Sequence, residues 1–341
     1  MSATETKKVA PTPIPTQERL SYYSAQNVPF LLSIGILVAM IMIYLILFVL
    51  RQQRLPGSFE LATTLNNSMT VGLAALGQSL VVLTGGIDLS VGGMVDVTNS
   101  VAARLMQDNP GSILGVSALV LLIGAGMGLV NGLCVTYGRL QPIIVTIATL
   151  AIWQGVALLI LPQPGGSIPA FFTNLLAGDS SAPGGLPASL IIFILLILLW
   201  QVLRRTPFLV TIYAIGNDER AARANGAPVE IAKIGAYTLG GLFAGAAGLY
   251  LAASSTSGDA TTGTQFTLTS IAAVVLGGIS LFGGRGSAVG SLVGACILTL
   301  LLNVLFFAGV NPQLQEFFQG LFLILAVVIS TLIRRLLQSA R

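Results

Sequence analysis

The chain has 341 residues, of which 54% are hydrophobic and only 8% are charged, and its mean hydropathy is +0.89. A soluble domain carries roughly 25% charged residues, so this composition excludes an ordinary soluble protein and indicates a membrane protein. The net charge of +4 is small and predicts no nucleic-acid partner. The chain lacks histidine, and Cys134 and Cys296 lie in separate apolar runs. We therefore predict no metal site, no disulfide framework and no enzyme active site.

The N-terminal segment 1–28 is polar and contains Pro11, Pro13 and Pro15, which predict a short flexible arm in the cytoplasm. The apolar run from Phe30 to Leu50 is too long for the hydrophobic part of a signal peptide, and it lacks a small-residue cleavage site. We therefore interpret this run as a retained membrane span.

Apolar runs of roughly 20 residues recur along the rest of the chain. In lipid, backbone N–H and C=O groups must be satisfied within their own segment, so such runs are typical of transmembrane helices. We predict an all-α, polytopic membrane protein with a transmembrane domain at 29–333 and a cytoplasmic tail at 334–341. The expected spans, about ten in number, are 29–50, 62–84, 91–106, 112–136, 142–161, 188–203, 233–253, 268–282, 287–308 and 315–333.

The basic residues predict that both termini are cytoplasmic. With the N-terminus inside, only Arg51, Arg54 and Arg104 of the 16 Lys and Arg residues fall on or near the outside. The opposite orientation would reverse this ratio, against the tendency of cytoplasmic loops to carry the basic residues. The residues placed inside are Lys7, Lys8, Arg19, Arg139, Arg204, Arg205, Arg220, Arg223, Lys233, Arg285, Arg334, Arg335 and Arg341.

A glycine-rich segment, LVVLTGGIDLSVGG at 80–93, lies where the second predicted span ends. Gly85 and Gly86 permit backbone angles that break a helix. Asp88 and Ser90 suit the N-cap of the helix that follows, where they would satisfy free N–H groups. An acid near the end of a membrane helix is also a functional candidate, but we expect a structural role here.

The segment AVVLGGISLFGG at 273–284 repeats this pattern, with glycines at Gly277, Gly278, Gly283 and Gly284. Both segments are expected at the cytoplasmic end of an inward-running helix. Glycine-interrupted segments at matching positions of two halves point to the transport path of a transporter. An internal repeat and a chance similarity between glycine-rich segments both remain open.

The main inside loop, 204–232, contains a pattern typical of a short capped helix at 217–225. Asn217 suits the N-cap, acids follow in the first turn, a base lies near the end, and Gly226 suits the position after it. The small alanine side chains would let this helix enter a groove on a partner, and a solvated loop helix is the alternative. The residues of this predicted docking helix are Gly216, Asn217, Asp218, Glu219, Arg220, Ala221, Ala222, Arg223, Asn225 and Gly226.

Four segments carry a resemblance to a known family: GQSLVVLTGGIDLSVGG at 77–93, GLVNGLCV at 128–135, AIGNDERAARANGA at 214–227 and IAAVVLGGISLFGGRGS at 271–287. The chain resembles permeases of the ribose/xylose/galactose-type ATP-binding cassette importers, within the broad family that also contains branched-chain amino-acid permeases. The resemblance implies that the predicted docking helix is the coupling helix that contacts the ATPase. Two stretches depart from the family pattern, at 266–269 and after Arg139, which weakens an assignment to ribose in particular.

The resemblance also implies the partners and the location. They are a cytoplasmic ABC ATPase subunit, a second copy of the permease or a close relative, a periplasmic or extracellular solute-binding protein, and the lipid of a bacterial inner membrane. The chain holds no P-loop motif, whose lysine binds the β- and γ-phosphates. We therefore expect the protein itself to bind no cofactor and ATP to be hydrolysed on the separate subunit.

Neutral amides at membrane depth are the candidates for the translocation path, because they match the hydroxyl groups of a sugar without carrying charge. Amides that bridge neighbouring helices are the alternative at each position. Trp153 suits either stacking on a sugar or an anchor at the lipid interface. The path candidates are Asn66, Asn67, Gln78, Asn131, Gln154 and Asn303.

Two other functions remain open. An ion-coupled secondary transporter would need buried acids, for which Asp88 and Asp96 are the candidates. An ABC permease for a non-sugar solute, such as a branched-chain amino acid, would share the architecture. The sequence does not distinguish between pentoses, hexoses and related polyols, or between a homodimeric and a heterodimeric pore.

Overall fold

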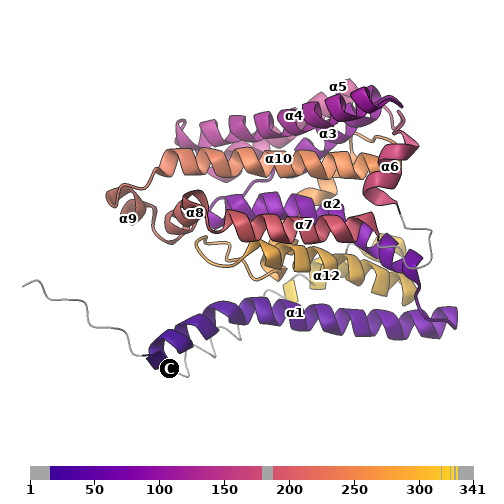
Figure 1. Cartoon of the computed structure of the whole chain (residues 1–341), viewed down its shortest axis with the longest axis horizontal. Coiled ribbons are helices and arrows are strands. Elements are labelled where there is room, and N and C mark those ends of the chain that lie inside the picture. Colours follow the sequence, from indigo (N-terminus) through magenta and orange to yellow (C-terminus); the bar gives the residue numbers. More distant parts are fainter. Residues whose placement is uncertain (1–15, 179–186, 316, 323, 326–327, 329–341) are drawn as a thin grey trace, which may run out of the picture.

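A computed structural model describes residues 16–178, 187–315, 317–322, 324–325 and 328, with side chains from Val28 onward. Its elements are helices, and the described residues form no β structure beyond one isolated bridge between Gly165 and Gly258. The elements in Figure 1 are α1 Thr16–Gln52, α2 Ser58–Leu83, α3 Val91–Leu105, α4 Pro110–Thr136, α5 Pro142–Ile160, α6 Ala170–Ala177, α7 Ala188–Leu203, α8 Pro207–Asn217, α9 Glu219–Ala224, α10 Val229–Ser255, the 3-10 helix η1 Thr262–Thr264, α11 Gln265–Leu276 and α12 Ala288–Phe307.

Five helices of the described chain are long and apolar enough to cross a membrane: the Val28–Gln52 part of α1, and α4, α5, α10 and α12. α7 and α8 make a sixth span if they are counted together, although they bend by 79° at a short break. α3 and α11 have 15 and 12 residues, short of the roughly 20 that a crossing needs. The all-α, polytopic membrane fold is confirmed, whereas the count of about ten spans is not.

Several predicted boundaries are wrong. α1 begins at Thr16, inside the segment expected to be a flexible arm. α11 ends at Leu276, so the predicted span 268–282 ran through a helix break. The predicted loops 162–187 and 204–232 contain α6 and α8, which we did not expect. The first 15 residues, the tail and about half of the tenth predicted span lie outside the described residues.

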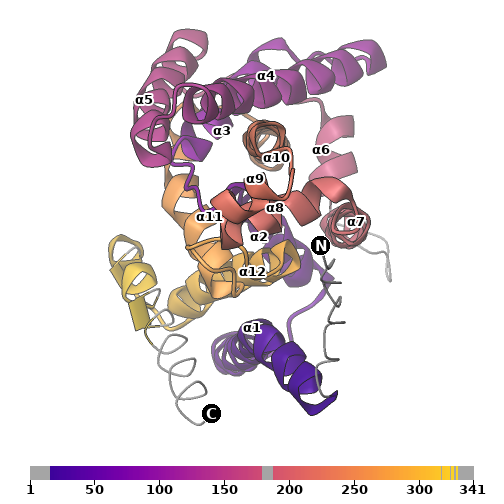
Figure 2. The same cartoon turned by 90° about the vertical axis from the view of Figure 1, so that its left-hand side faces the viewer.

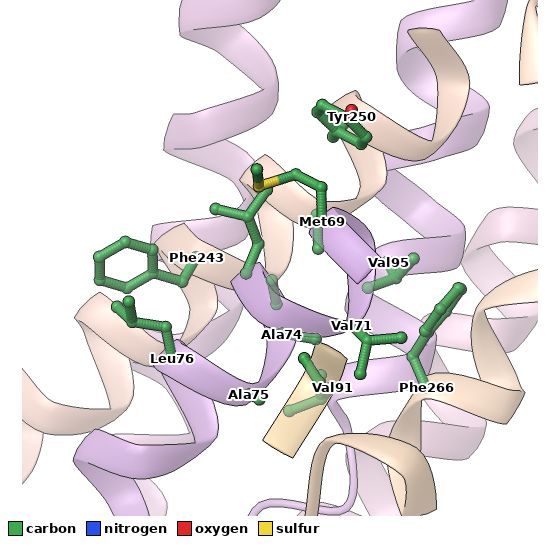
Figure 3. Close-up of a cluster of buried hydrophobic side chains, with 14 of the residues drawn as sticks. Met69, Val71, Ala74, Ala75, Leu76, Val91, Val95, Phe243, Tyr250 and Phe266 are labelled. Atoms are coloured by element: carbon green, nitrogen blue, oxygen red, sulfur yellow. The ribbon is translucent and has the colours of Figure 1, made fainter. Parts of the chain in front are cut away.

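α2 lies in the middle of the bundle, surrounded by α7, α10, α11 and α12 (Figure 2). Every residue of α2 from Ser68 to Leu83 is buried. Met69 and Leu76 pack beside Phe243 and Tyr250 of α10 (Figure 3). Because protein rather than lipid covers α2, this helix tolerates the polar side chains that make it less apolar than a lipid-facing span.

α4 and α10 pack closely along a row of glycines. A Cβ atom at Gly124 would collide with the backbone oxygen of Gly241, and a Cβ atom at Gly241 would collide with that of Gly124. Small residues of this kind let membrane helices approach until their backbones touch, where van der Waals packing holds them together. α10 is therefore held against both α2 and α4.

The long helices run lengthwise along the bundle, and short elements mark its two ends (Figure 1). α8 and α9 lie at one end, which we call the α9 end, and α6 lies at the other, the α6 end. α1 begins at the α9 end. This arrangement separates the predicted docking helix from the loops expected outside.

Candidate functional site

The first helix break, residues 81–90, comprises the last turn of α2, which ends at Leu83, and the turn that follows it. Gly85 adopts the left-handed conformation with φ of +84°. The N–H of Gly85 donates to the oxygen of Val82 at 2.9 Å, and the N–H of Gly86 donates to that of Val81 at 3.2 Å. These bonds form a Schellman motif, which satisfies the last carbonyl groups of a helix.

The second helix break, residues 274–282, ends α11 in the same way. Gly278 has φ of +85°. Its N–H donates to the oxygen of Val275 at 2.9 Å, and the N–H of Ile279 donates to that of Val274 at 3.1 Å. Gly85 therefore corresponds to Gly278, and the first break has one extra residue after this glycine.

The turns that follow the two breaks also correspond. In the first, the Oδ1 of Asp88 accepts a hydrogen bond from the N–H of Ser90 at 2.8 Å. In the second, the hydroxyl oxygen of Ser280 accepts one from the N–H of Phe282 at 3.3 Å. The match in backbone geometry and hydrogen bonding favours an internal repeat over a chance similarity.

The predicted N-cap role of Asp88 and Ser90 needs correction. Ser90 does occupy the N-cap position of α3, but its side chain caps no N–H group of that helix. Its hydroxyl instead donates to the Oδ1 of Asp88 at 2.6 Å. Both side chains are buried, so the pair shapes the turn between α2 and α3 from inside the bundle.

Gln78 and Asn131, two of the predicted path residues, hold this turn in place. The Nδ2 of Asn131 donates to the hydroxyl oxygen of Ser90 at 2.7 Å. The amide of Gln78, oriented to satisfy both contacts, donates to the backbone oxygen of Asp88 at 3.0 Å and accepts from its N–H at 3.2 Å. The two amides therefore hold the turn of the first break.

The other predicted path residues are separated along the bundle. Asn66 donates to the oxygen of Ala177 at 2.7 Å and accepts from the hydroxyl of Tyr250 at 2.8 Å. Asn303 donates to Thr64 at 3.1 Å. Asn67 is exposed and Gln154 is half-buried. The structure does not bring the six amides together into one site.

α9, the centre of the predicted docking helix, covers Glu219–Ala224. The prediction that Asn217 is its N-cap is wrong, because Asn217 is the last residue of α8 and Asp218 takes the cap position. The Oδ1 of Asp218 accepts from the N–H groups of Arg220 and Ala221 at 2.9 and 3.0 Å. Gly226 follows the helix with φ of +79°, as expected for that position.

Only one face of α9 is packed against the bundle. Ala222 is buried with Ile215, Val229 and Ala232 in a small cluster of its own. The exposed residues of the helix and its C-terminal turn are Arg220, Ala221, Arg223, Ala224, Asn225 and Gly226. α9 thus offers a surface of small and basic side chains at this end of the bundle.

Ion pairs tie α9 to the first turns of α10. Nζ of Lys233 lies 2.5 Å from a carboxylate oxygen of Glu219. Arg223 pairs with Glu230 and, at 3.5 Å, with Glu219. The hydrogen bond that Arg223 donates to Glu230 is the main reason that the pKa of Arg223 is raised above its ordinary value.

The first helix break and the two glycines that follow the second break meet the C-terminal end of α8. The N–H of Gly284 donates to the oxygen of Leu83, the last residue of α2, at 3.0 Å. The Nδ2 of Asn217 donates to the oxygen of Gly284 at 3.2 Å and to that of Tyr213 at 2.8 Å. We call this meeting of Leu83–Gly85, Gly283–Gly284 and Gly216–Asn217 the backbone junction.

Glycine is required at the backbone junction because three main chains touch there. A Cβ atom at Gly216 would collide with the oxygen of Leu83 and the nitrogen of Gly284. One at Gly283 would lie 2.8 Å from the nitrogen of Gly85 and 2.9 Å from the Cα of Gly216. The segment that leads directly into α9 therefore contacts the end of α2 and the loop that follows α11.

One residue beside the backbone junction, Tyr213, was missed by sequence reasoning. The hydroxyl of Tyr213 donates to the oxygen of Gly286 at 2.6 Å, which links α8 to the loop that follows the second break. Tyr213 lies one helical turn before Asn217, so the helical spacing from a residue already selected could have identified it.

Comparisons with known proteins place the chain in a family. The family described as "Branched-chain amino acid transport system / permease component" matches residues 60–327. The ribose import permease protein of Bacillus subtilis is 36% identical over 262 residues, which cover 76% of this chain and 80% of the relative. The fructose import permease protein of Rhizobium meliloti is 37% identical over 292 residues, covering 82% and 79%.

A third relative, the autoinducer 2 import system permease protein of Escherichia coli strain HS, is 30% identical over 300 residues, covering 86% of this chain and 90% of the relative. No solved structure is significantly similar to the chain. The family match covers most of the chain, including both helix breaks, α8 and α9. The chain therefore belongs to the family of branched-chain amino acid transport system permease components.

Proposed function

We propose that this protein is the membrane-spanning permease subunit of an ATP-binding cassette importer for a sugar-like solute. Relatives that cover most of the chain are named as import permeases for ribose, fructose and autoinducer 2. Permease subunits of such importers are transport components rather than enzymes. The bacterial inner membrane is the location that this role requires.

The observation that carries the mechanism is the backbone junction. The segment Gly216–Asn217 contacts the last turn of α2 and the loop after α11, and it continues directly into α9. Displacement of α9 would therefore act on both broken helices at once. Such a shared contact suits a switch between two packed arrangements of the helices, which open the path to one side or the other.

We place the α9 end in the cytoplasm, with both chain termini on that side. Arg204, Arg205, Arg220 and Arg223 precede or lie on α9, which supports this orientation. Arg54 follows the C-terminal end of α1, and Arg104 lies in the last turn of α3. Both would then lie near the outside. This orientation presents the exposed face of α9 to a cytoplasmic ATPase.

The proposed assembly has three kinds of partner. A cytoplasmic ABC ATPase subunit docks on α9 and hydrolyses ATP, so the permease needs no cofactor of its own. A second copy of the chain, or a close relative, completes the pore. A binding protein delivers the solute from the outside, and membrane lipid surrounds the lipid-facing helices.

The decisive test is reconstitution in proteoliposomes with the proposed ATPase and binding-protein partners. We expect ATP-dependent accumulation of D-ribose or D-fructose that requires all the components. Accumulation of L-leucine instead would assign the chain to a branched-chain amino-acid importer. Failure of the complete complex to accumulate any of these solutes would contradict the proposal.

An ion-coupled secondary transporter is the second candidate, because Asp88 and Asp96 are buried acids at membrane depth. Asp88 is committed to Ser90 through two hydrogen bonds, which leaves Asp96 as the stronger candidate for ion coupling. The chain alone, in liposomes with a proton or sodium gradient, separates the two functions. Solute accumulation under those conditions would favour the secondary transporter.

A further inference from the structure

Three buried polar atoms on α3 and α5 have no hydrogen-bond partner: Oδ2 of Asp96, Oγ of Ser100 and Nε1 of Trp153. We propose that these atoms belong to the subsite that binds the transported solute, through hydrogen bonds to its hydroxyl groups. This inference rests on the proposed function and assigns it a location. It moves the expected path away from amides such as Gln78 and Asn131, whose side chains hold the first helix break.

Asp96 is the strongest member of this group. Its side chain is fully buried, and its Oδ1 accepts a hydrogen bond from the N–H of Gly263 at 2.5 Å. That bond fixes the carboxylate and leaves Oδ2 directed at no protein donor. Leaving a buried polar atom without a hydrogen-bond partner costs about 1–3 kcal/mol, and anchoring Gly263 alone would need only the one oxygen that an asparagine also supplies.

The packing of α3 on α5 brings the three residues to neighbouring levels. At one end, the Cβ position of Gly93 lies 3.0 Å from the Cβ of Trp153. At the other end, Arg104 donates to the backbone oxygen of Ile160. The two contacts show that α3 and α5 run side by side in the same direction, so Asp96 lies close to the level of Trp153.

Ser100 lies four residues after Asp96, one turn further along the same face of α3. Gln154, a predicted path residue, follows Trp153 directly and is half-buried. Along the bundle, Trp153 therefore lies at the level of Gly93, Asp96 just under one turn beyond it and Ser100 one turn further.

The chemistry of the three atoms suits a polyhydroxylated solute. A carboxylate oxygen accepts from hydroxyl groups, a serine hydroxyl both donates and accepts, and an indole N–H donates. The indole ring adds an apolar face on which a sugar ring can stack. A sodium site would need several oxygen ligands around the ion, and the indole donor is unsuited to it.

The other unpartnered polar atoms of the described chain do not form a comparable group. Oδ1 of Asn131 and the hydroxyl of Tyr237 lie near the first break, where the Nδ2 of Asn131 is already bonded to Ser90. The remaining hydroxyls are scattered over other helices, and none of these atoms belongs to a carboxylate. α3 also starts at a helix break, and transporters often place their solute sites beside broken helices.

The test uses the complete importer in proteoliposomes, with whichever of D-ribose and D-fructose the parental complex accumulates. Asp96→Asn keeps the acceptor for Gly263 and changes only the unpartnered side of the carboxylate. We expect KM for uptake to rise by about tenfold or more, while ATP hydrolysis stimulated by the binding protein persists. Asp108→Asn, at an exposed position between α3 and α4, is the matched control and should leave KM within about twofold.

Trp153→Phe provides an independent readout, because it keeps an aromatic ring and removes only the N–H donor. We expect KM to rise by about threefold to tenfold. Parental KM values in both Asp96→Asn and Trp153→Phe would overturn the inference. If Asp96→Asn does not insert, Trp153→Phe alone decides, and an unchanged KM in that variant overturns the inference.

Direct occupancy can be measured with Ser100→Cys in a background that also carries Cys134→Ala and Cys296→Ala. The transported sugar should slow labelling of the introduced thiol by a small methanethiosulfonate reagent, whereas L-leucine should not. Labelling that sugar leaves unchanged would contradict a subsite at Ser100. A parental complex that accumulates no sugar contradicts the proposed function itself, whereas parental uptake with unaffected variants contradicts only this inference.

Discussion

The first helix break, at 81–90, and the second, at 274–282, end their helices with the same hydrogen bonds but lie in different surroundings. In the first, Asp88 is only 1% exposed, and the turn is held by Gln78 and Asn131. In the second, the side chain of Phe282 is 93% exposed. The Schellman motif satisfies the carbonyl groups of a helix end by itself. The same backbone turn can therefore form both in a buried and in an exposed environment.

The difference teaches which break is anchored. Buried side chains hold the turn of the first break against α2 and α4. In the second break, the buried hydroxyl of Ser33 holds the helix end by donating to the oxygen of Leu276 at 2.7 Å, whereas the turn and the loop after it depend on their backbone and on contacts with α8. Because the end of α2 and the loop after the second break both touch Gly216–Asn217, a displacement of α8 and α9 should move the second turn more easily than the first. The following variants test this contrast, from the largest expected effect to the smallest.

Gly216→Ala should have the largest effect, because it acts where both breaks and α8 meet. The added methyl group would collide with the backbone of Leu83 and of Gly284, and relief requires the main chains to separate. Overpacking of this kind costs about 1–3 kcal/mol, so we expect uptake to fall by about tenfold or more. The measurement is ATP-dependent uptake per correctly inserted permease.

Gly126→Ala is the matched control for that variant. Gly126 lies in α4 with no atom near its Cβ position, so alanine there causes no collision and suits a helix better than glycine does. We expect uptake to stay within about twofold of the parental protein. Equal losses in the two glycine variants would contradict a specific role for the backbone junction.

Asp88→Ala and Ser280→Ala compare the corresponding turns directly. Asp88→Ala removes the acceptor for both the N–H and the hydroxyl of Ser90 inside the bundle. We expect it to lower the free energy of unfolding in detergent by about 2–3 kcal/mol. Ser280→Ala removes one bond of 3.3 Å at a half-buried side chain and should cost less than about 1 kcal/mol.

Chemical or thermal unfolding of the two purified variants, followed by tryptophan fluorescence, makes this comparison. Asp88→Asn serves as the control, since its amide oxygen can still accept from the N–H of Ser90. A cost for Ser280→Ala that equals the cost for Asp88→Ala would remove the distinction between an anchored and a less anchored break.

Local signals were sufficient to predict part of this arrangement from the sequence. The breaks follow from Gly85 and Gly278, and the end of α9 from Gly226, because each signal acts within a few residues of itself. α8 was missed although its start carries a recognisable signal, the cap at Thr206 followed by Pro207. It falls within the segment 204–232, which we predicted to be an inside loop.

Other features depend on packing between distant segments and have no local signal. Nothing near Gly216 indicates that its neighbours are Leu83 and Gly284. The amide candidates show the same limit, since Gln78 and Asn131 proved to hold a turn between helices rather than line a common site. Residue type can select polar groups at membrane depth, but only the packing decides whether each one already has a partner.

The ion pairs between α9 and α10 should give the smallest effect, because they lie at the surface of the α9 end. Glu219→Lys places two positive groups together at the contact with Lys233, which is 2.5 Å long in the parental protein. Exposed pairs contribute little, so we expect the ratio of solute transported to ATP hydrolysed to fall by only about twofold to fivefold. The double variant Glu219→Lys with Lys233→Glu restores opposite charges and should recover most of that ratio. If the double variant transports no more solute per ATP than Glu219→Lys does, α9 acts through the backbone junction alone. α10 would then follow the movement of the helix breaks rather than contribute to it.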